Sequence, residues 1–141
     1  MEADRSQIKV VESDEFRKDI KKLGKRYRSV KQDVRSLTAQ LKAGEIPGDR
    51  ITGNKYPVYK VRVKNSDIKK GQSGGYRVIY YIRTPEAILL TNLYSKSDRS
   101  DISNKEVEDV IEQYELELDR QEPEVTISEP EELEDEDRST S

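Results

Sequence analysis

Residues 58–83, VYKVRVKNSDIKKGQSGGYRVIYYIR, contain the change of hydrophobic period that decides the fold. Apolar and basic residues alternate over positions 58–65, which predicts a strand with one face toward a core. A polar, glycine-rich connection at 66–75 leads to a second strand at 76–83. A tight turn and a third strand at 87–94 follow, so the segment predicts an antiparallel meander.

Upstream of the meander, apolar residues recur at the spacing of α-helices. A short apolar run at 8–11 predicts a first strand, and Ser13 or Asp14 can cap the helix that follows it. Two segments of helical spacing are separated by Gly24, and Gly44 fits the end of the second. Their apolar positions are Phe16, Ile20 and Leu23, then Val30, Val34, Leu37 and Leu41. We therefore expect an amphipathic helical hairpin, followed by a loop at 43–57.

Downstream of the meander, the pattern predicts a last helix and then a tail. Ser103 and Glu106 have the spacing of a capping box, and the apolar stripe of the helix extends to Leu118. We expect a domain at 1–118 and an acidic tail at 119–141 that is disordered in isolation. The fold class is α+β, with the helical hairpin packed on one face of a small, mainly antiparallel sheet. The charged residues are expected on the open face of that sheet.

The composition restricts the chemistry. The chain of 141 residues has no histidine and no cysteine, which excludes a Ser-His-Asp triad, a zinc hydrolase and thiolate chemistry. Catalysis must therefore use Lys, Arg, Tyr, Asp, Glu or Ser. No stretch is apolar enough to span a bilayer, and the first residues lack the core of a signal peptide. We expect a cytoplasmic protein that uses no metal or other cofactor.

The net charge of −3 conceals two oppositely charged parts. Residues 1–105 contain 24 Lys and Arg against 13 Asp and Glu, which gives +11. Residues 106–141 contain 2 against 16, which gives −14. A basic body indicates a domain that binds a polyanion. The acidic end could compete with that polyanion for the body in cis, or it could only keep a basic protein soluble, and both interpretations stay open.

Cations and tyrosines gather on the predicted meander. The basic side of the first strand carries Lys60, Arg62 and Lys64, and pairing as a hairpin brings Arg77 near them. Such cations hold phosphates, and aromatic rings stack on unpaired bases. The expected catalytic residues are Lys60, Arg62, Arg77, Tyr94 and Lys96, and the expected RNA-binding residues are Lys64, Lys69, Lys70, Tyr81, Asp98 and Arg99. The alternative is a merely solvated strand face with tyrosines that pack in the core or at its edge.

Three segments resemble RelE-type toxins of the RelE/ParE superfamily, in its RelE and HigB-like branches. The stretch at 58–83, with its YK-x-R strand and SGGYR, resembles their central hairpin. LLTNLYSKSDRSDIS at 89–103 resembles the end of their last core strand. FRKDIKKLGKRYRSVKQDV at 16–34 resembles their N-terminal helices. The resemblance covers roughly residues 8–118 and implies the RelE-like fold.

The resemblance implies the toxin of a type II toxin–antitoxin system. Such a toxin is an mRNA interferase, an endoribonuclease that acts in the ribosomal A site without a metal and so inhibits translation. The implied partners are a cognate antitoxin, the ribosome and mRNA, with no membrane and no DNA contact except through the antitoxin. The family's reaction is attack of a ribose 2′-hydroxyl on the adjacent phosphate, which leaves a cyclic phosphate and a 5′-hydroxyl.

The resemblance also implies roles for individual residues. Lys60 and Arg62 match the basic pair of the second strand, and Arg77 matches the arginine of the GYR motif, which stabilises the phosphate. Lys96 and Arg99 match the basic segment after the last core strand. Crowding by neighbouring cations favours the neutral form of Lys60, which predicts that Lys60 is the base.

The acid that protonates the leaving oxygen stays open. Ser97 stands where some relatives carry an arginine, and Ser103 stands near the position of an aromatic residue that acts as their general acid. The chain also lacks the histidine that HigB-like relatives use. Tyr94 and Asp98 are the remaining candidates. Two other functions are considered: a ParE-like inhibitor of DNA gyrase, disfavoured by the basic cluster, and a catalytically inactive RelE-fold binding module.

Overall fold

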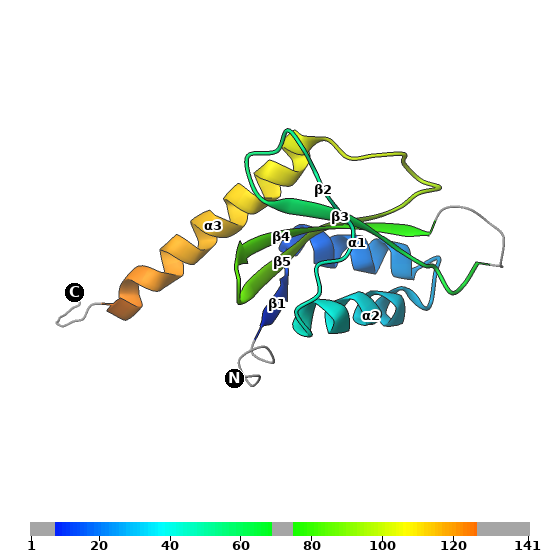
Figure 1. The fold of residues 1–141 in the computed structure, drawn as a ribbon, viewed down its shortest axis with the longest axis horizontal. Helices are drawn as coiled ribbons and strands as arrows, with labels where there is room; N and C mark the ends of the chain where they lie inside the picture. Colours follow the sequence, from blue (N-terminus) through cyan, green and yellow to red (C-terminus); the bar gives the residue numbers. More distant parts are fainter. Residues whose placement is uncertain (1–7, 69–74, 127–141) are drawn as a thin grey trace. The chain divides into compact units, whose positions relative to one another are not determined.

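The computed structural model describes residues 8–68 and 75–126 and has the α+β architecture expected from the sequence (Figure 1). The elements follow in the order β1 (Lys9–Glu12), α1 (Asp14–Gly24), α2 (Val30–Lys42), β2 (Asp49–Arg50), β3 (Val58–Val63), β4 (Tyr76–Thr84), β5 (Ala87–Ser95) and α3 (Asn104–Thr126). Within the described ranges, no helix is long and apolar enough to cross a membrane.

The five strands form one mixed sheet in the order β1-β5-β4-β3-β2. The predicted meander is confirmed, because β3 pairs with β4 and β4 with β5, both antiparallel. The first strand lies beside β5 and runs parallel to it. The short strand β2 pairs with β3 inside the segment expected to be a loop. Two residues are too few to produce an alternating pattern, which explains why the sequence did not reveal β2.

The helices α1 and α2 lie together on one face of the sheet, as predicted (Figure 1). The start of α1 is capped by Ser13, whose Oγ accepts a hydrogen bond from the backbone N–H of Phe16 at 3.0 Å. The core between helices and sheet contains all seven apolar residues predicted for the two helices, together with Val63, Tyr76, Val78, Tyr80, Ile88, Leu90 and Leu93. One face of the meander is therefore buried in this core.

The opposite face of the sheet carries Lys60, Arg62 and Arg77, as expected, but part of it is covered. Ile79 and Leu89 are buried there, and the ring of Tyr56 packs edge-on against Tyr81 with centroids 5.5 Å apart. The 51–57 loop that carries Tyr56 is itself bonded to the start of α3. The alternating pattern predicts which side chains share a face, but it does not reveal which loop covers them.

The chain divides into two compact units, one ending at Val110 and the other beginning at Ile111. In the second unit, α3 continues as a helix to Thr126, past the end expected near Leu118. Arg, Gln and Glu at 120–122 are good helix formers, which accounts for the longer helix. Residues 127–141 lie outside the described residues, so the disordered tail and the boundary of the toxin domain at 118 stay predictions.

Candidate functional site

The register of the meander brings the main predicted residues together. Arg62 lies opposite Arg77, and Arg77 lies opposite Tyr94, so these three residues form one row across β3, β4 and β5. Lys60 is two residues along β3 from Arg62 and therefore emerges on the same face. Arg62 is exposed, and Lys60 and Arg77 are half-buried. We call these three residues, with Lys60 beside them, the catalytic row, because all four were expected from the sequence to be catalytic.

A carboxylate occupies the centre of this cationic surface. Asp101 Oδ1 accepts hydrogen bonds from Lys60 Nζ at 2.9 Å, from the backbone N–H of Ile102 at 2.8 Å and from the hydroxyl of Tyr94 at 3.4 Å. The hydrogen bond from Lys60, followed by that from Ile102, holds the pKa of Asp101 below its usual value. Lys60 and Asp101 therefore form an ion pair, and the expectation that Lys60 is the base stays a prediction.

The two candidate acids are placed differently. Tyr94 belongs to the catalytic row, and burial raises the pKa of its hydroxyl above its usual value, so that the hydroxyl stays protonated. The guanidinium of Arg99 lies 5.7 Å from the centroid of the Tyr94 ring, which is 5% exposed. Asp98 forms an ion pair with Arg26, just beyond α1, at 2.5 Å. Of the two candidates, only Tyr94 hydrogen-bonds to the group that contacts Lys60.

The remaining basic residues hold the loop after β5. Lys96 Nζ donates to the carbonyl of Ser100 at 3.1 Å. Arg99 donates from Nε to the carbonyl of Asp101 and from Nη2 to Glu106, both at 2.9 Å. The same Glu106 closes the predicted capping box with Ser103. Their contacts show a structural task for Lys96 and Arg99, and the catalytic and RNA-binding roles expected of them stay predictions.

The other four expected RNA-binding residues differ in exposure and in whether the structure describes them. Tyr81 is 8% exposed and its ring packs against Tyr56, and the RNA-binding role expected of it stays a prediction. Lys64 is exposed just after β3, as an RNA contact requires. Lys69 and Lys70 lie outside the described residues.

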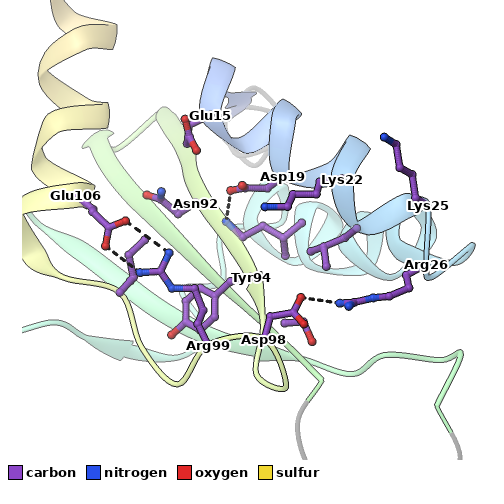
Figure 2. A pocket seen from close by; sticks show the side chains of 14 residues that line it. Glu15, Asp19, Lys22, Lys25, Arg26, Asn92, Tyr94, Asp98, Arg99 and Glu106 are labelled. Carbon is purple, nitrogen blue, oxygen red and sulfur yellow. Dashed lines mark hydrogen bonds and ion pairs between the residues drawn. The ribbon is translucent and has the colours of Figure 1, made fainter.

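A pocket of about 290 Å³ lies between α1 and the end of β5, with Tyr94 and Arg99 in its lining (Figure 2). In it, the backbone N–H of Leu93 donates to Asp19 Oδ2 at 3.0 Å. Burial raises the pKa of Asp19 to about 6, against the lowering effect of this hydrogen bond. Asn92 also lines the pocket, and no hydrogen-bond partner for its buried Oδ1 is present among the described residues.

Sequence reasoning missed two carboxylates, Asp101 and Asp19. The available signal for Asp101 was a second aspartate three residues after Asp98, close behind a strand that carries candidate residues. Asp19 stands next to Ile20 on the edge of the apolar stripe of α1, which is an unusual place for an acid. Within the described ranges, no cluster of three or more His, Cys, Asp or Glu could hold a metal ion.

Comparison with known families agrees with the RelE-like fold. A family model described as the RelE toxin of the RelE/RelB toxin–antitoxin system matches residues 16–126, well over half of the chain. The matched range contains α1 from Phe16 onward, α2, the meander and α3 to Thr126, and thus the whole catalytic row and Asp101. No curated protein matches the chain.

Proposed function

The chain belongs to the RelE toxin family of toxin–antitoxin systems, and from this premise we propose that it is a ribosome-dependent endonuclease of mRNA that needs no metal. The family implies an antitoxin as its partner. The proposal adds the ribosomal A site and mRNA as targets, and the cytoplasm as the place of action. The observation that carries it is the catalytic row, in which Arg62, Arg77 and Tyr94 lie side by side next to Lys60.

The row suits phosphoryl transfer from RNA. In this reaction the 2′-oxygen forms a bond to phosphorus and the bond from phosphorus to the 5′-oxygen breaks. Arg62, Arg77 and Lys60 are placed to offset the charge that builds on the pentavalent phosphorane. The protonated hydroxyl of Tyr94 is the acid in this proposal, and it supplies a proton to the departing 5′-oxygen.

The structure also supports dependence on the ribosome. Lys60 is already paired with Asp101, and the ring of Tyr94 is buried, so these two groups are not freely presented to RNA in solution. Holding the RNA in line for attack is worth several kcal/mol, and a ribosome can supply that positioning. We therefore expect weak cleavage of free RNA.

The test compares translated with naked mRNA. Primer extension on mRNA translated by purified ribosomes should show cuts within or beside codons when the protein is added. Equal cutting of naked RNA, or no cutting in either sample, contradicts the proposal. Induction in cells separates it from the other functions, because an endonuclease cuts transcripts, a gyrase inhibitor produces DNA breaks, and an inactive binding module does neither.

A further inference from the structure

We propose that Asp101 is the general base that removes the proton from the 2′-hydroxyl of the RNA. This assignment rests on the proposed function, since it names a group for the same reaction. The general base is then not Lys60, as the sequence predicted, but a residue 41 positions further along the chain that hydrogen-bonds to Lys60.

The hydrogen bonds of Asp101 leave one of its oxygens available. All three donors described above reach Oδ1: Lys60, Tyr94 and the backbone of Ile102. No further hydrogen bond to this carboxylate is made by residues 8–68 or 75–126, and its side chain is 65% exposed. The carboxylate is therefore fixed in orientation through one oxygen, while Oδ2 can accept a proton from a bound substrate.

Other groups near the catalytic row are less suited to this task. Lys60 is an ammonium in its pair with Asp101 and has no lone pair to accept a proton. Asp98 and Glu106 are held by Arg26 and Arg99. Asp49 lies opposite Lys60 in the β2–β3 pairing and adds a negative charge at the edge of the row.

A carboxylate on a phosphate-binding surface weakens the attraction for RNA, and a role in the reaction would explain why this surface carries one. Asp101 is ionised at neutral pH and can accept a proton, and its lowered pKa makes it a weaker base than an ordinary aspartate. The charged groups that face it are Lys60, with Arg77 and Arg62 further along the same surface, and Arg99, which bonds to its backbone carbonyl.

The complete step is balanced in protons. Asp101 takes the proton of the 2′-hydroxyl while the 2′-oxygen bonds to phosphorus. The electron pair of the breaking bond leaves with the 5′-oxygen, which takes the proton of the Tyr94 hydroxyl. The contact between Tyr94 and Asp101 then allows the proton to return from the carboxylic acid to the phenolate.

The principal test is Asp101→Asn, with Asp109→Asn as a matched control. Asp109 pairs with Lys105 on the surface of α3, so the control removes the same charge outside the catalytic row. On ribosomes translating mRNA, Asp101→Asn should cut about 10²-fold or more slowly, which is the usual scale for a general base. Its affinity for a ribosome complex with a 2′-deoxy nucleotide at the cut position should be unchanged or higher, because a negative charge is lost.

A shielding role for Asp101 predicts the opposite result. If Asp101 only covers Lys60, Asp101→Asn frees the lysine and cuts as fast as the wild type or faster, and that outcome overturns the inference. If the wild type itself cuts nothing, the proposed function fails instead, so the two failures are distinguishable.

Two further readouts separate a base from a structural residue. The wild-type rate should fall as the pH drops through the lowered pKa of Asp101, and Asp101→Asn should lack this acid limb. Added formate should restore cleavage by Asp101→Ala but not by Arg77→Ala, since formate can replace a carboxylate and not a guanidinium. An acid limb that persists in Asp101→Asn, or a lack of any rescue, argues against the assignment.

Discussion

The ammonium of Lys60 lies 2.9 Å from the carboxylate of Asp101, although the two residues are 41 positions apart in the chain. One comes from the middle of β3 and the other from the loop between β5 and α3. The pair places a negative charge on a surface whose other side chains include Arg62 and Arg77. With Tyr94 on β5, the reactivity of this surface therefore depends on three strands and on one loop.

Replacement of Arg77 by alanine should abolish toxicity and leave the fold intact. Arg77 is half-buried on the side of the sheet away from the helical core, so its main contribution is charge rather than packing. A loss of about 10²-fold or more in cleavage rate is expected for one such group. Arg35→Ala on the exposed side of α2 is the control and should stay toxic. Full toxicity of Arg77→Ala would show that the active site is assigned wrongly, and unfolding would point to a structural role.

Replacement of Lys60 by methionine should raise the pKa of Asp101 toward its ordinary value. The hydrogen bond from Lys60 is the largest cause of the present lowering, and methionine keeps the length of the side chain without its charge. Titration of the Asp101 carboxyl by NMR measures the change without depending on activity. Lys105→Met on α3 removes an equal charge elsewhere and should not move it. An unchanged titration would mean that the Lys60–Asp101 pair does not form in solution.

Asp19→Asn should stabilise the protein at neutral pH. Burial raises the pKa of Asp19 to about 6 from 3.8, so the stability it contributes is complete below about pH 3.8 and is lost as the pH rises through 6. Asparagine keeps an oxygen that can accept from Leu93, without the charge. The gain at pH 7 should be on the order of 1 kcal/mol, because water screens a partly exposed group.

Urea unfolding at several pH values checks this expectation. The difference between Asp19→Asn and the wild type should vanish near pH 3.5 and reach its full size above pH 6. Glu86→Gln, at an exposed position of the turn between β4 and β5, is the control. A difference that is constant with pH would show that the effect does not come from the ionisation of Asp19.

Removal of residues 127–141 should tighten binding to RNA or ribosomes at low salt. This segment contains seven acidic residues and one basic residue, a net charge of −6, tethered to a basic body. A tethered competitor acts at an effective concentration on the order of millimolar. The gap between the full chain and the shortened one should close as salt is added. Equal affinities at low salt would leave the segment as a solubilising extension.

The sequence alone determined the helices and every strand except β2, the core positions of α1 and α2, and the meeting of the strand residues. Alternation at 58–65 and helical spacing at Phe16, Ile20 and Leu23 are local patterns, and each states directly which side chains share a face. The hairpin between β3 and β4 then places Arg77 opposite Arg62, because its partners are close in the chain.

Only the tertiary structure decided which groups touch these residues. Asp101 forms an ion pair with Lys60, Asp98 forms an ion pair with Arg26, and the ring of Tyr56 packs against Tyr81. Each contact joins residues from different elements, and at least one partner in each lies in a loop or turn. The path of such a segment depends on what it packs against and not on its own periodicity, so no local pattern could predict these contacts.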